Sequence, residues 1–117
     1  MIKGRNGARL RCGRAVGQRG GMTTSELAGL ADPSALSLPL QALWHDRRGD
    51  WETAHELAQK AGDPAGDWVH AYLHRKEGDT GNAGYWYARA GRPAFEGPLD
   101  AEWGGIADAL LAAEGVM

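Results

Sequence analysis

His70 and His74 are the two side chains of this sequence that are best spaced for metal chemistry. Residues four apart on a helix share one face, so these imidazole rings could supply two ligands to an ion such as zinc. His45, which matches His74 in an internal repeat described below, could approach from a neighbouring helix as a third ligand. The competing interpretation is one packed, hydrogen-bonded histidine per repeat, with His70 exposed. We adopt the second interpretation, which predicts no metal ion and no cofactor.

Other catalytic signatures are incomplete or absent. His55 opens the run HELAQ, which begins like the HExxH zinc-protease motif, but Gln59 stands where the second zinc-binding histidine would be. The sequence has no P-loop, no dinucleotide-binding fingerprint and no serine in a nucleophile-elbow context. Its single cysteine, Cys12, excludes an internal disulfide and a cysteine-based zinc site. We therefore expect a protein without enzymatic activity.

The residues around the histidines are repeated along the chain. Ala42–Pro64 aligns without gaps with Ala71–Pro93, and eight positions are identical, among them a Gly-Asp pair at 49–50 and again at 78–79. A repeat of this length is typical of arrays in which each unit is one supersecondary element. The sequence therefore predicts two copies of one structural unit.

Each copy is predicted to form two helices. Leu40, Leu43 and Trp44 follow helical spacing in the first copy. Gly49 then favours a left-handed stop, and Asp50 can cap the next helix. The predicted fold is all-α: a helix-turn-helix array of about five helices with terminal capping helices. A single domain is expected over 22–117, with repeats at about 38–64 and 65–93, a C-terminal helix at about 100–114 that Asp100 could cap, and a short helix around Ser25–Ala31.

Small residues recur at matching places in both copies. They are Ala42, Gly49, Ala54 and Ala61 in the first, and Ala71, Gly78, Ala83 and Ala90 in the second. The last helix of the second copy also reads Ala-x-x-Trp-Tyr-x-x-Ala over 83–90. These residues resemble the tetratricopeptide and Sel1-like family of helical repeats over 38–93. The period is shorter than is usual in that family, and His45 and His74 stand where tyrosine is common.

This resemblance implies a protein-protein interaction or scaffold module. In such repeats the first helix of each unit lines a concave groove, which here would present basic and aromatic groups to an acidic or carboxylate-ended peptide. The family's paired Asn and Lys for clamping a carboxylate are absent. Carried over by position, the candidate peptide-binding surface is Leu43, Asp46, Arg47, Trp68, Tyr72, Arg75 and Lys76. The alternative is that Trp68 and Tyr72 are core residues and that Arg75 and Lys76 form a solvated face.

Residues 1–21 differ sharply from the rest of the chain, with six basic residues, six glycines and no acidic residue. Such a segment cannot bury an apolar face, so we expect it to be disordered. Three interpretations stay open: Met22 is the true start, the segment is a basic arm that contacts nucleic acid phosphates, or it is a targeting sequence. Nucleic acid binding is expected only if the arm belongs to the native protein.

The remaining features indicate a cytoplasmic protein without a membrane segment. No apolar run approaches the roughly 20 residues that span a bilayer, and the cysteine content gives no sign of an oxidising compartment. The expected partner is another protein or peptide. A homodimer is a further expectation, because two repeats leave apolar ends that a second copy could cover.

Overall fold

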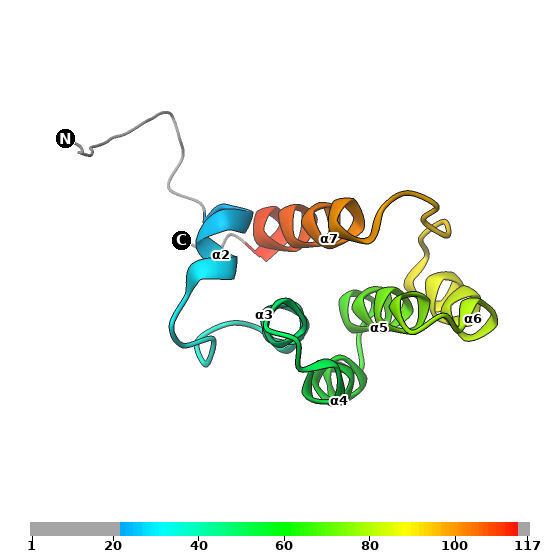
Figure 1. Cartoon of the computed structure of the whole chain (residues 1–117), viewed down its shortest axis with the longest axis horizontal. Coiled ribbons are helices and arrows are strands. Elements are labelled where there is room, and N and C mark those ends of the chain that lie inside the picture. Colours follow the sequence, from blue (N-terminus) through cyan, green and yellow to red (C-terminus); the bar gives the residue numbers. More distant parts are fainter. Residues whose placement is uncertain (1–21, 115–117) are drawn as a thin grey trace.

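The structure, a computed structural model, describes residues 22–114 and shows six α-helices and no β-strand in that range (Figure 1). The helices are α2 (Thr24–Gly29), α3 (Leu38–Arg47), α4 (Trp51–Ala61), α5 (Pro64–Lys76), α6 (Thr80–Ala90) and α7 (Leu99–Glu114). The predicted all-α fold is confirmed. The predicted basic tail, 1–21, and the end of the predicted domain, 115–117, lie outside the described residues.

Helices α3 and α4 form one hairpin, α5 and α6 form a second, and the two turns have the same geometry. Gly49 and Gly78 have φ angles of 83° and 91°, in the left-handed region that glycine enters without steric cost. The aspartates that follow them, Asp50 and Asp79, each accept a hydrogen bond from the backbone N–H three residues on. The Gly-Asp pairs therefore end one helix and begin the next, as the sequence predicts.

The two hairpins meet where α4 packs against α5. Gly62 ends α4 with a φ of 65°, and Asp63 caps α5 by accepting a hydrogen bond of 2.7 Å from the Gly66 N–H. Gly66 lies directly against α4, because a Cβ atom at this position would come within 2.7 Å of the Ala58 carbonyl oxygen. This close backbone approach brings side chains of α4 within reach of those on α5.

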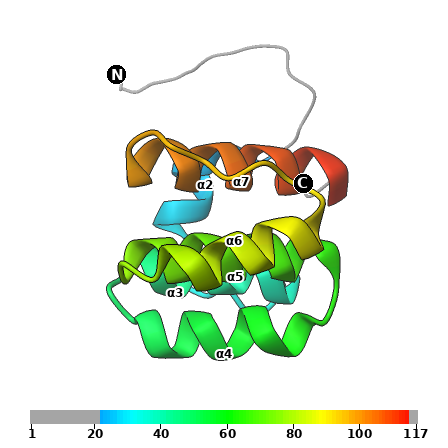
Figure 2. The ribbon, with the colours of Figure 1, turned by 90° about the vertical axis from the view of Figure 1, so that its right-hand side faces the viewer.

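Helix α7 crosses α3 and α5 on the side opposite α4, as the two views of the ribbon show (Figure 1, Figure 2). Helix α2 packs against both α3 and α7, and its Leu27 is fully buried. The apolar face of α7 is part of the main core through Trp103, Ile106, Ala107, Leu110 and Leu111. Helix α7 is therefore a structural part of the fold and does more than cover one end of it.

Two details of the predicted elements differ from the structure. Helix α7 begins at Leu99, so Asp100 lies in its first turn and pairs with Arg47 at 3.3 Å instead of capping the helix. The short N-terminal helix ends at Gly29, before the predicted Ala31. Across residues 22–114, no helix combines the length and the apolar character that a membrane span requires.

The small residues at the helix crossings should not tolerate larger side chains. Ala54 and Ala83 are 0% and 2% exposed, so Ala54→Leu or Ala83→Leu is expected to overpack a crossing and cost roughly 1–3 kcal/mol of unfolding free energy. Ala88→Leu, at an exposed position of α6, is the matched control and should be nearly neutral. Urea unfolding measures all three. Equal stability of the three variants would contradict the close packing of these helices.

Candidate functional site

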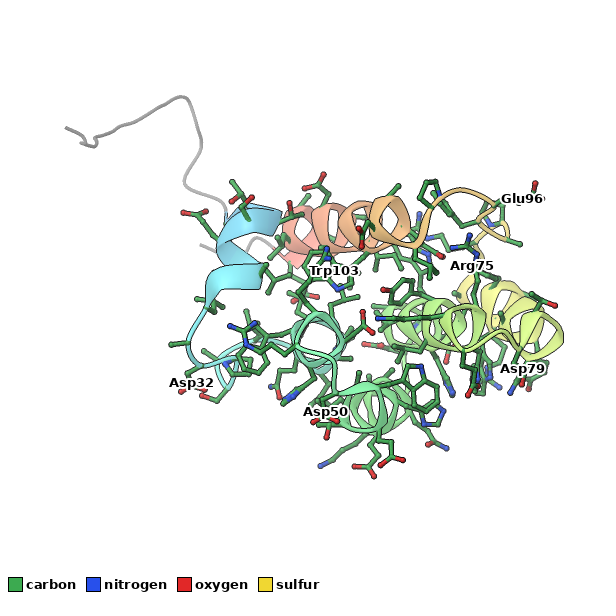
Figure 3. All side chains as sticks on the ribbon, viewed as in Figure 1. Asp32, Asp50, Arg75, Asp79, Glu96 and Trp103 are labelled. Carbon is green, nitrogen blue, oxygen red and sulfur yellow. The ribbon has the colours of Figure 1, made fainter. Side chains whose placement is uncertain are left out.

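The face of α3 that was predicted to bind a peptide is covered by α7. The Trp103 indole N–H donates a hydrogen bond of 3.0 Å to the Leu43 carbonyl oxygen, and Figure 3 shows Trp103 between α7 and α3. The Arg47 guanidinium lies 4.0 Å from the centre of the Trp103 ring and is also paired with Asp100. Leu43 and Arg47 therefore contact α7 of the same chain, at the face where a peptide was predicted to bind.

Three further residues of the predicted surface form an internal network between α3 and α5. The Tyr72 hydroxyl donates a hydrogen bond of 2.7 Å to Asp46, and the Lys76 ammonium donates one of 2.8 Å to the other oxygen of the same carboxylate. Burial, reinforced by the Asp46 carboxylate, raises the pKa of Tyr72 far above its ordinary value. Because Leu43, Asp46 and Tyr72 are all buried, they stabilise the fold and are not exposed to a ligand.

Arg75, also predicted to bind a peptide, anchors α7 and the loop before it. Its guanidinium donates to Glu102 at 2.8 Å and to the Gly97 carbonyl oxygen, and Figure 3 shows it on the side of α5 that faces this loop. Glu102 is only 2% exposed and also accepts a hydrogen bond from the Tyr87 hydroxyl. Burial and this bond raise the pKa of Tyr87. The Arg75–Glu102–Tyr87 network is therefore part of the core.

Trp68 differs from the other predicted residues because it lines a pocket. The pocket has a volume of about 220 Å³ and lies between the start of α5, the loop after α6 and α7. Its walls are mostly apolar, and its lining residues are Trp68, Arg92, Pro93, Phe95, Glu102, Gly105 and Ile106. The Arg92 guanidinium lies 3.9 Å from the centre of the Trp68 ring. The pocket combines an aromatic wall with a basic rim.

A second cluster of chemically capable side chains lies where α4 packs on α5. His55, His70 and His74 each place one ring nitrogen so that the three lie within 4.8 Å of one another. The Nε2 atoms of His55 and His70 are 2.9 Å apart, close enough for a hydrogen bond. Three imidazole nitrogens at such distances can form a hydrogen-bonded chain or a set of metal ligands.

The predicted third histidine, His45, is not part of this cluster. It lies near the end of α3, where its Nδ1 is 3.9 Å from an Asp50 carboxylate oxygen and its ring contacts Trp44 edge-on. The structure instead places His55 of α4 beside His70 and His74, and His70 is 3% exposed where an exposed side chain was expected. The sequence feature that could have indicated His55 is its spacing from Trp51, because residues four apart share one face of a helix. In the structure the two rings stack with their centres 4.9 Å apart.

The surroundings of His55 and His70 favour the neutral forms of these two rings. Burial, followed by the neighbouring His55 and His74, lowers the pKa of His70 to about 4. Burial and the nearby His74 also lower the pKa of His55, against opposing effects of Glu77 and Glu56. A neutral imidazole has a lone pair on one ring nitrogen, and this nitrogen can accept a hydrogen bond or bind a metal ion.

Acidification of the metal-free protein should therefore weaken the fold. The folded-state pKa of His70 lies below its ordinary value of 6.5, so its contribution to stability is complete above that pH and is lost as the pH falls toward about 4. The full loss would be about 3 kcal/mol. Urea unfolding at pH steps across this window, with a chelator present, measures it. A His70→Gln variant should show a flatter pH dependence; the same slope in both proteins would contradict this origin.

Arg92 and Phe95 are two pocket residues that the sequence did not indicate. Both lie in the loop between α6 and α7, where no periodicity marks which side chains face inward.

Comparison with family models, with curated proteins and with solved structures finds no match to this chain. The likeness to tetratricopeptide and Sel1-like repeats thus rests on the repeated residues alone.

Proposed function

We propose that residues 22–114 form a two-unit helix-turn-helix array that acts as a non-enzymatic protein-interaction module, with the Trp68 pocket as its contact point. The equivalence of the units is supported by their turns, in which Gly49-Asp50 and Gly78-Asp79 have the same backbone conformation and the same capping bonds. In this array α2 and α7 cover surfaces that the two hairpins leave open.

The position of α7 limits where a partner can bind. Displacing α7 would expose its buried apolar side chains, of which Ile106, Leu110 and Leu111 each contribute about 1.5–3 kcal/mol, and their sum is comparable with the whole stability of a small domain. A partner therefore does not replace α7 in the groove of α3 and α5. The Trp68 pocket lies beside α7 and needs no such displacement.

The observation that carries this proposal is the chemistry of the pocket. Trp68 and Phe95 supply apolar walls, and a volume of about 220 Å³ is enough for one aromatic ring, since an engineered cavity of about 150 Å³ binds benzene. Arg92 stands at the rim, and no ion-pair partner for it is found within 22–114. The Glu102 carboxylate is already bonded to Arg75 and Tyr87. The ligand that fits is an aromatic or branched apolar side chain next to a carboxylate, as at the C-terminus of a peptide.

N-acetylphenylalanine is a minimal probe for this pocket, titrated into the full chain while the indole N–H signals of the tryptophans are followed by NMR. At about 0.3 kcal/mol per heavy atom, a dissociation constant on the order of 1 mM is expected. The signal of Trp68 should shift most. The uncharged amide, N-acetylphenylalaninamide, should bind several-fold more weakly because it lacks the carboxylate that Arg92 would hold.

Two arginine variants provide the controls. Arg92→Gln should weaken binding of the acid to the level of the amide. Arg48→Gln should leave it unchanged, because Arg48 covers Trp44 at 3.8 Å in a similar way but binds the Ala28 and Leu30 carbonyl oxygens and does not line the pocket. Equal binding of acid and amide, or no saturable shift of Trp68, would refute the proposed contact point.

A further inference from the structure

His55, His70 and His74, which meet where α4 packs on α5, are grouped like the ligands of a metal ion. His55 comes from α4 in the first hairpin, whereas His70 and His74 come from α5 in the second. Their ring centres are 4.6 Å, 5.1 Å and 4.7 Å apart, and one nitrogen of each lies within 4.8 Å of the other two. Tetrahedral zinc with Zn–N bonds of about 2.0–2.1 Å requires its nitrogens to be roughly 3.4 Å apart. The 2.9 Å between the Nε2 atoms of His55 and His70 is shorter than this spacing, and the 4.8 Å limit of the set is longer, so the rings must adjust when an ion binds.

The surroundings orient the rings as metal ligands are usually oriented. The Nδ1 of His74 is 2.6 Å from a Glu77 carboxylate oxygen, which favours the tautomer that carries its proton on Nδ1 and a lone pair on Nε2. The Asn82 side-chain amide lies 3.5 Å from this Nε2, and an ion would take its place. Asp79 also lies near His74, but it is already used in capping α6. Glu77 is therefore placed to orient a ligand and to balance part of the charge of a cation.

Two tryptophans hold the other rings in place. Trp51 stacks on His55 at 4.9 Å, and Trp86 stacks on His70 at 4.0 Å. The Trp51 indole is itself fixed by a hydrogen bond of 2.9 Å to the Leu73 carbonyl oxygen. Such an aromatic shell restricts ring motion and lowers the entropic cost of assembling the ligands.

We propose that His55, His70 and His74 form a binding site for a divalent transition metal ion, with zinc as the best-fitting ion and Glu77 as the group that orients His74. Imidazole nitrogens suit Zn²⁺, Ni²⁺ and Cu²⁺ and do not suit Mg²⁺ or Ca²⁺, which prefer oxygen ligands. The bound ion ties α4 to α5 and so joins the two hairpins. This site is independent of the Trp68 pocket and goes beyond the proposed peptide binding.

Isothermal titration of the full chain with ZnCl₂ tests the site directly, after any affinity tag is removed and the protein is treated with a chelator. One ion per chain is expected to bind, with a rise of several degrees in melting temperature when the ion is in excess. Titration with Co²⁺ should give the visible absorption of a four-coordinate ion. MgCl₂ should give neither binding heat nor a stability change.

Histidine variants then assign the ligands. His55→Gln removes a partly buried ligand and should leave the fold intact, while lowering zinc affinity by more than the 10–100-fold that changes to groups orienting a ligand cost. Glu77→Gln should lower the affinity by about 10–100-fold. His45→Gln is the matched control, because His45 lies outside the cluster, and it should bind zinc like the unmodified protein.

Each result decides the proposal. Stoichiometric zinc binding that is lost in His55→Gln and kept in His45→Gln supports it. No zinc binding by the unmodified chain, or equal losses in the two histidine variants, would overturn it. In that case the rings form only a packed, hydrogen-bonded chain.

Discussion

Glu102→Ala is expected to cost about 3–5 kcal/mol of unfolding free energy, because removing one partner of a buried ion pair leaves the other charge uncompensated. Glu102 is 2% exposed and binds two groups, the Arg75 guanidinium at 2.8 Å and the Tyr87 hydroxyl. Alanine at position 102 would leave the Arg75 guanidinium and the Tyr87 hydroxyl without this hydrogen-bond partner. Urea unfolding followed by circular dichroism measures the loss, and Asp108→Ala, at an exposed position of the same helix, should be nearly neutral.

A double variant separates the charge from the packing. Arg75→Met combined with Glu102→Leu removes both charges and keeps apolar volume, so it should recover much of the stability lost by Glu102→Ala alone. A Glu102→Ala protein as stable as Asp108→Ala would contradict the buried network.

The helices of the two hairpins were predictable because their limits are encoded locally. Glycine at a left-handed stop and aspartate as a cap act within one turn of the chain, so Gly49-Asp50 and Gly78-Asp79 could be interpreted without knowledge of the fold. The position of α7 was not predictable in this way. Its apolar face shows that it packs against something, but the bond from Trp103 to the Leu43 carbonyl oxygen joins distant parts of the chain. That contact helps explain why part of the predicted peptide surface, Leu43, Asp46 and Tyr72, is buried.

The candidate metal site was half predictable for a similar reason. The spacing of His70 and His74 places them on one helix face regardless of the fold. The third member depends on which helix packs against that face. The sequence repeat pointed to His45, the counterpart of His74, but the cluster lies between the two hairpins, where α4 of the first meets α5 of the second. Helix α3 has only the short α2 before it, so His45 does not lie between two hairpins.

Trp103→Ala is expected to cost about 3–5 kcal/mol of unfolding free energy, as much as Glu102→Ala in the same helix. The side chain is 2% exposed, donates a hydrogen bond to the Leu43 carbonyl oxygen and carries the Arg47 guanidinium on its ring. Trp103→Phe keeps most of the apolar burial and should cost less. Tyr85→Ala removes an aromatic ring that is 56% exposed, and it should be close to neutral in the same urea titration.

The cooperativity of urea unfolding in Trp103→Ala is as informative as the urea concentration at its midpoint. Because α7 shares one core with α3 and α5, we expect a single cooperative transition at lower urea, with amide hydrogen exchange accelerated in α3 and α5 as well as in α7. Exchange accelerated in α7 alone would contradict a shared core. It would mean that the hairpins stand without this helix, and that Leu43, Arg47 and Tyr72 can become the exposed groove that the repeat pattern predicted. The same experiment therefore tests whether α7 is a structural element of the core or a removable cover of a binding surface.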